Sequence, residues 1–162
     1  MEIQFERFEQ QLGFHLANFS GVRVRKFNRT TSILDGDGEI FVDVTDEYQI
    51  MLTMALSSLG NNQWNEYPVK IAKSRMCSFL NNQYKEYQEY FVESTSFPRV
   101  GDDWVCPFPK GRHWVRDFAI EGSWVPDFVP SGYWRYTISI FDARDEIVVN
   151  LIVYMKMKQG YV

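Results

Sequence analysis

The chain has 162 residues, of which 45% are hydrophobic and 23% charged, and this composition is typical of one globular domain and excludes a disordered chain. Its net charge of −4, with Lys and Arg scattered along the sequence, excludes the basic face of a typical nucleic-acid-binding protein. No apolar stretch approaches the roughly 18 residues that a membrane span requires, so we expect no membrane span.

The main secondary-structure pattern along the chain is alternation of apolar and polar residues, which is typical of half-buried strands. It predicts strands at residues 22–25, 40–45, 50–56, 67–71, 113–120, 133–141 and 147–157. Turns are expected at residues 34–38, 61–62 and 142–145. Loops are expected at residues 94–111 and 122–132, where Pro and Gly concentrate.

One segment has a different period. Leu80, Tyr84, Tyr87 and Phe91 recur at spacings of four, three and four, which predicts one face of a helix over residues 77–92. Several short antiparallel strands with one helical insertion predict a mainly β fold. We expect a two-sheet, immunoglobulin-like antiparallel β-sandwich that forms a single domain over residues 1–162.

The sequence offers little for catalysis or metal binding. A hydrolase would need a nucleophile within hydrogen-bond reach of His15 or His113, and spacing alone shows none. No cluster of His, Cys and carboxylates has metal-ligand spacing. The run Asp35-Gly36-Asp37-Gly38-Glu39 lacks the distal Glu of a calcium loop and favours a tight turn. We therefore expect no enzyme activity, metal or cofactor.

The two cysteines, Cys77 and Cys106, lie 29 positions apart and leave two alternatives open. They are either buried thiols in a cytosolic protein or a disulfide in an exported one. The sequons that begin at Asn18 and Asn28 favour secretion and predict glycosylation at both positions. The acidic start after Met1 does not have the pattern of a signal peptide, which favours either a cytosolic protein or a mature N-terminus.

The aromatic content of 17% is high, with 13 Phe, 9 Tyr and 5 Trp, and fits either an aromatic-rich core or the wall of an apolar cavity. The side chains expected to line the space between the sheets are Ile50, Leu52, Met54, Leu80, Tyr84, Tyr87, Phe91, Trp114, Phe118, Trp124, Phe128, Trp134, Leu151 and Val153. Tyr84, Tyr87 and Arg135 are candidates for orienting a polar ligand head group. Periodicity cannot separate a filled core from a cavity wall.

Four motifs in order resemble the insect chemosensory A and B proteins, a fly group related to the ML lipid-recognition superfamily and its ganglioside activator proteins. They are Arg25-Lys26-Phe27-Asn28-Arg29-Thr30-Thr31 before Leu34-Asp35-Gly36; Cys77-Ser78-Phe79-Leu80; Ser96-Phe97-Pro98 with Cys106-Pro107-Phe108-Pro109-Lys110-Gly111; and Val129-Pro130-Ser131-Gly132-Tyr133-Trp134-Arg135. The resemblance spans roughly residues 22–157. It implies a secreted ML-type sandwich with a Cys77–Cys106 disulfide and an apolar cavity.

The resemblance further implies a carrier or presenter of a lipid, hydrocarbon or pheromone in chemosensation, with a sensory receptor or ion channel as partner. The alternative is an extracellular protein–protein interaction module with a solid core, anchored by exposed aromatic residues among Trp64, Trp104 and Tyr133. A continuous apolar void of several hundred cubic ångströms would favour the carrier. A core packed to ordinary density would favour the interaction module.

Overall fold

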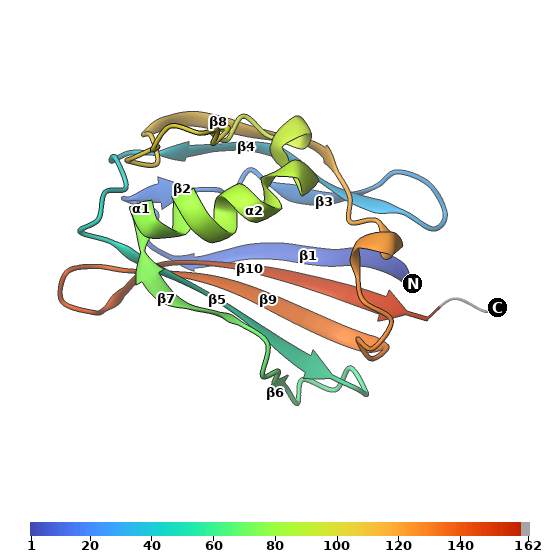
Figure 1. Cartoon of the computed structure of the whole chain (residues 1–162). Helices are drawn as coiled ribbons and strands as arrows, with labels where there is room; N and C mark the ends of the chain where they lie inside the picture. Colours follow the sequence, from blue (N-terminus) through green and yellow to red (C-terminus); the bar gives the residue numbers. More distant parts are fainter. Residues whose placement is uncertain (160–162) are drawn as a thin grey trace.

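The structure is a computed structural model that describes residues 1–159, and it confirms the predicted sandwich of two antiparallel sheets (Figure 1). Sheet A has the order β1 (Glu2–Leu12), β10 (Ile147–Lys158), β9 (Gly132–Phe141) and β5 (Gln49–Ser57). The far edge of β5 pairs with β6 (Asn65–Glu66) and β7 (Ile71–Arg75). In sheet B, β4 (Ser32–Ile40) pairs with β2 (Ala17–Asn18), β3 (Arg23–Lys26) and β8 (Gly111–Phe118).

A helix follows β7 directly and lies between the two sheets in Figure 1. It consists of α1 (Met76–Phe79), a π-helical turn at Leu80–Tyr84, α2 (Lys85–Tyr87) and a 3₁₀ turn at Gln88–Tyr90. Further 3₁₀ turns occupy Val92–Ser94 and Gly122–Trp124. The predicted helix over residues 77–92 is thus confirmed to within two residues at each end.

Strand β1 closes one side of the sandwich through side-chain hydrogen bonds to sheet B. The Gln10 amide donates to the Ala17 carbonyl at 2.7 Å and accepts from the Phe19 N–H at 2.8 Å. The Ser32 hydroxyl donates to the Phe5 carbonyl at 2.9 Å. Side-chain hydrogen bonds, rather than backbone strand pairing, therefore join β1 to sheet B.

The turn expected at residues 34–38 is wrong, because these residues lie inside β4. The two glycines serve close packing: a Cβ on Gly38 would overlap the Phe19 ring, and Gly36 has φ +146° beside the Gly21 carbonyl. Absence of a side chain therefore lets the chain continue as a strand where its composition favours a turn.

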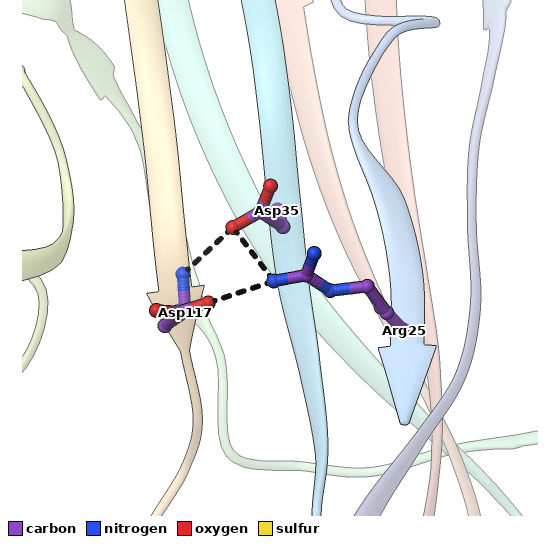
Figure 2. A network of polar contacts seen from close by, with 3 residues as sticks. All are labelled: Arg25, Asp35 and Asp117. Atoms are coloured by element: carbon purple, nitrogen blue, oxygen red, sulfur yellow. Dashed lines mark hydrogen bonds and ion pairs between the residues drawn. The ribbon is translucent and has the colours of Figure 1, made fainter. Parts of the chain in front are cut away.

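One acidic residue of the same segment, Asp35, is held by neighbouring strands (Figure 2). The Arg25 guanidinium of β3 lies 3.0 Å from the Asp117 carboxylate and 3.6 Å from that of Asp35 in β4. The Asp117 N–H also donates to the Asp35 carboxylate at 3.1 Å. One arginine thus links β3, β4 and the end of β8, and it balances two like charges at the surface.

Two other strand predictions are displaced. The strand expected at residues 40–45 is wrong after Ile40, where β4 ends, and Val44 makes only an isolated bridge to Phe108. The strand expected at residues 67–71 overlaps β7 only at Ile71, because the pairing with β5 lies at Ile71–Arg75. Both segments alternate in sequence, but neighbouring hydrogen-bond partners decide where pairing occurs.

Candidate functional site: an aromatic seam between the sheets

The inward side chains of the two sheets form two buried clusters. The first joins sheet A to sheet B and contains Ile3, Phe5, Ala17, Phe19, Val22, Leu34, Ile40, Val115, Trp134, Met155 and Met157. The second packs the helix against β5 and contains Ile50, Leu52, Met76, Phe79, Leu80, Tyr84 and Val100. A main core with a smaller cluster beneath a helix and a long loop is a common arrangement within one domain, and here the two clusters meet at a few shared side chains.

Four side chains contact both clusters, and we refer to them as the seam: Val44, Phe97, Phe108 and Tyr136. Each is only half-buried although it lies between the clusters. The rings of Phe97 and Phe108 are 5.6 Å apart, and both contact the buried His113 ring, at 5.4 and 5.5 Å. The seam therefore has an aromatic wall from the loop before β8 and a second wall from β9.

The Tyr136 hydroxyl makes no hydrogen bond within residues 1–159, and it is not among the buried unpartnered side-chain atoms of those residues, so it remains accessible to solvent. Burial, followed by the charge of Tyr87, raises the pKa of Tyr136 to about 12. Tyr84 differs, because its hydroxyl donates to the Pro98 carbonyl at 2.6 Å. Burial also raises the Tyr84 pKa well above its usual value. Tyr136 therefore presents a neutral phenol with free hydrogen-bonding capacity at the seam.

The helix is fixed to the loop that carries Phe97 and Phe108. Cys77 and Cys106 form a disulfide with their Cα atoms 5.3 Å apart, as the family resemblance implies. The Asn81 amide accepts from the Val105 N–H at 2.9 Å and donates to its carbonyl at 2.8 Å. The Gln88 amide makes the same pair of bonds with Val100, at 2.8 and 2.6 Å. One covalent bond and two side-chain amides thus position one wall of the seam.

Ten of the predicted lining residues lie in the two clusters or pack against them: Ile50, Leu52, Met54, Leu80, Tyr84, Phe91, Phe118, Trp134, Leu151 and Val153. Tyr136 shares its face of β9 with Trp134 and Ile138, so strand alternation could have added it to the prediction. Phe97 and Phe108 come from a loop, where no periodic pattern exists.

The other predicted lining residues are corrections. Trp114 lies on the face of β8 opposite His113 and Val115, where the Arg116 guanidinium is 5.1 Å from its ring centre. Trp124 packs on Tyr90 with ring centres 4.8 Å apart, outside both clusters. The Phe128 side chain is 72% exposed. Alternation and aromatic character do not determine which face of a strand is inward, or how a Pro-rich loop folds.

The three residues proposed to orient a ligand head group lie in different parts of the structure. Tyr87 is 46% exposed on the helix and influences Tyr136 electrostatically. Arg135 lies on the outer face of sheet A, where its guanidinium is 5.0 Å from the Trp64 ring centre, so it is not placed to orient a head group between the sheets. Of the three candidates, only Tyr84 belongs to the inter-sheet clusters.

His113 has the nucleophile neighbour that a hydrolase would require. The Ser96 hydroxyl oxygen lies 3.4 Å from His113 Nδ1, and His113 Nε2 lies 3.1 Å from the Pro109 carbonyl. Since a carbonyl only accepts, Nε2 carries the proton and Nδ1 accepts from Ser96. The same Ser96 oxygen accepts the Trp114 N–H at 2.8 Å. These contacts fasten the seam loop to β8.

Two hollows lie on the outer faces of the sheets, and both have polar residues in their walls. One, of about 310 Å³, is lined by Asn18, Ser20, Gly21, Asp37, Gly38, Glu39, Phe41 and Arg112. The other, of about 350 Å³, is lined by Thr53, Met54, Ala55, Trp64, Glu66, Arg135 and Thr137. Neither is a continuous apolar void between the sheets, which is the feature that a carrier is expected to have.

The structure also bears on the surroundings of the cysteines, the two sequons and the expected absence of a membrane span. Asp46 lies near the sulfurs of Cys77 and Cys106, but both sulfurs are committed to the disulfide and cannot act as thiolate ligands. The Asn18 and Asn28 side-chain oxygens accept from their sequon hydroxyls, at 2.6 and 3.2 Å. Within residues 1–159, no helix combines the length and apolar character needed to cross a membrane.

These features define a two-layer β-sandwich whose single disulfide anchors a helix beside an aromatic seam. Residues 50–136 match the model of a family described as "Protein of unknown function (DUF1091)", and the chain belongs to that family because the match covers more than half of it. The matched segment runs from β5 to the middle of β9 and includes both cysteines and the helix. No curated protein matches the chain.

Proposed function

We propose that this protein binds a hydrophobic ligand, such as a lipid or a long hydrocarbon, at the seam between its sheets and carries or presents it unchanged. The observation behind this proposal is the half-burial of apolar side chains at the place where the two clusters meet. In a closed sandwich such side chains would be fully covered by the opposite sheet. Water-sized molecules reach them here, so an apolar guest could cover them.

Affinity would come from covering the apolar side chains of the seam. A ligand that covers them would gain about 25 cal/mol for each square ångström of apolar surface removed from water. A long alkyl chain would supply most of the affinity in this way.

The proposals of an extracellular location, a pheromone-like ligand and a receptor partner rest on the motif resemblance to insect chemosensory and ML-type proteins. The disulfide supports passage through an oxidising compartment and therefore an extracellular site of action. An extracellular carrier of this kind would deliver or present a pheromone-like ligand to a sensory receptor or ion channel. We propose no catalytic step, because the Ser96–His113 pair already holds the seam loop in place.

The test is binding of an apolar fluorescent probe, combined with extraction of the native protein and mass spectrometry of any bound lipid. Wild-type protein should bind the probe. Phe97→Gln should weaken probe binding at least tenfold, because a polar amide replaces a seam ring. Phe128→Gln is the matched control and should bind normally, because Phe128 is 72% exposed. Circular dichroism should show that both variants remain folded.

An interaction module is the second candidate function, and one outer surface favours it. On the outer face of sheet A, Trp64 packs edge-on against Tyr154 with ring centres 5.9 Å apart. Arg135 lies over Trp64, and the Arg7 guanidinium is 3.9 Å from the Tyr154 ring centre. Aromatic and arginine side chains of this kind are common anchors of protein interfaces. Protein that neither binds the probe nor releases lipid would favour this second function.

A further inference from the structure

The hollow of about 350 Å³ on the outer face of sheet A has a small residue between two charged ones. The strand register pairs Ala55 of β5 with Glu66 of β6 on one side and with Arg135 of β9 on the other. Residues paired across a sheet point to the same face, so the three side chains share the face that is turned away from sheet B. Adjacent strands are about 4.8 Å apart, so the two charged residues are separated by about 10 Å, with only a methyl group between them.

An aromatic ring and a guanidinium form one side of this hollow. Trp64, immediately before β6, lines the hollow together with Arg135. The Arg135 guanidinium lies 5.0 Å from the Trp64 ring centre, and the Tyr154 ring packs edge-on against the indole at 5.9 Å. A guanidinium that lies over an indole is restricted in orientation, so its N–H groups form a planar set of donors.

The hydrogen-bonding groups of the hollow complement one another. Thr53 and Thr137 are direct partners in the pairing of β5 with β9, both line the hollow, and each hydroxyl can donate and accept. The Glu66 carboxylate only accepts, and the Arg135 guanidinium only donates. Within residues 1–159, neither of these two charged groups forms an ion pair with another side chain. The hollow therefore offers an acceptor, a donor and two hydroxyls beside an apolar ring.

We infer that this hollow binds a neutral sugar, either as a free hexose or as the terminal unit of a glycan. A sugar ring has a face of C–H groups that can lie against an indole, and its hydroxyls both donate and accept. Because the hollow carries one acidic and one basic group, a charged ligand would be attracted by one and repelled by the other. A hydrocarbon would cover the polar groups without pairing them. The hollow and the seam lie on opposite faces of sheet A, so this inference does not depend on the carrier function.

The test is titration of isotope-labelled full-length protein with the methyl glycosides of glucose, galactose and mannose, followed by NMR of the tryptophan indole N–H signals. Trp64→Phe identifies the Trp64 signal by its disappearance. At least one glycoside should shift the Trp64 signal in a saturable manner. The signal of Trp104, an exposed residue in the loop before β8, should not move. A trisaccharide of the preferred sugar distinguishes the two sources, because tighter binding than the glycoside indicates a glycan and equal binding indicates a single sugar unit.

Two variants test the proposed contacts without changing the shape of the sheet. The double variant Thr53→Val and Thr137→Val keeps the side-chain shape and the strand propensity but removes both hydroxyls, so sugar affinity should fall roughly tenfold or more. Arg135→Lys keeps the charge but loses the planar set of donors, and should weaken binding about fivefold. Arg112→Lys is the matched control, because Arg112 lines the hollow on sheet B and its replacement should leave sugar binding unchanged.

Three results would overturn the inference. One is the absence of any shift of the Trp64 signal at sugar concentrations of tens of millimolar. Another is tighter binding of glucuronate or glucosamine than of the neutral glycosides. The third is wild-type affinity in the double threonine variant when circular dichroism shows that it is folded. If no sugar binds but the apolar probe does, the sugar site is excluded and the carrier function stands.

Discussion

The helix end of the sandwich and the seam use similar residues but are packed differently. At the helix end, Leu80 is fully buried and Cys77 is 1% exposed, and a disulfide and two side-chain amides reinforce the packing. At the seam, Phe97, Phe108 and Tyr136 remain half-buried between two clusters. The comparison indicates that the stabilising contacts concentrate beside the proposed site, whereas the side chains of the site itself remain partly exposed.

The largest effect should come from removing packing at the helix end. Leu80→Ala should lower the free energy of unfolding by about 3–5 kcal/mol, because it leaves a cavity where the side chain is completely enclosed. Urea unfolding followed by tryptophan fluorescence measures the change. A loss below about 1 kcal/mol would contradict the distinction between the two regions.

The disulfide should contribute slightly less. Replacing both Cys77 and Cys106 with Ser should lower stability by about 3–4 kcal/mol, because the 29-residue separation closes a loop that restricts the unfolded chain. Thermal unfolding with and without reductant provides the measurement. Reductant should destabilise the wild-type protein and leave the double variant unchanged. If reductant has no effect on either protein, the disulfide does not stabilise the helix end.

A substitution at the seam should reduce ligand binding more than it reduces stability. Phe97→Leu should lower stability by only about 1 kcal/mol, because the side chain is already partly exposed and leucine retains part of its contacts. Probe affinity should nevertheless fall several-fold, since the ring forms part of the proposed wall. Equilibrium unfolding and probe titration on the same samples test both statements. A large stability loss with unchanged affinity would make Phe97 an ordinary core residue.

The last effect concerns pH and is confined to strongly alkaline solution. The Tyr136 pKa of about 12 lies above the ordinary tyrosine value of 10.0, so the phenol favours the folded state most below pH 10. Between pH 10 and about 12 the unfolded chain releases this proton first, and stability falls by at most about 1.4 kcal/mol per pH unit for one proton. Unfolding experiments across this range should show a shallower fall for Tyr136→Phe than for Tyr133→Phe. Equal slopes would place Tyr136 in water.

The sequence predicts the regular parts of this fold better than its edges. The helix and the β9–β10 hairpin follow directly from periodicity. Strand β1 was not predicted, because its pairing with β10 shifts register between Phe5 and Arg7 and interrupts the alternation there. The Asp-Gly run of β4 has turn composition, and only its neighbours Phe19 and Gly21 explain why it is extended.

The candidate site likewise contains residues that periodicity predicts and residues that it does not predict. Strand and helix positions such as Leu52, Leu80 and Leu151 were predicted, because each repeats with the period of its element. The seam rings Phe97 and Phe108 lie in a loop whose path depends on the disulfide and on the Asn81 and Gln88 amides. Those interactions join residues distant in sequence, and no local pattern encodes them.

The hydrogen bonds between β1 and sheet B also limit how the molecule can change shape. Gln10 and Ser32 fasten the sheets along one long side, whereas the opposite side is spanned by the helix and the loop it holds. We expect any widening of the sandwich to occur on the helix side rather than on the β1 side. A ligand would then have to pass the helix. Its rate of release would depend on the strength of the hydrogen bonds that Asn81 and Gln88 make to that loop.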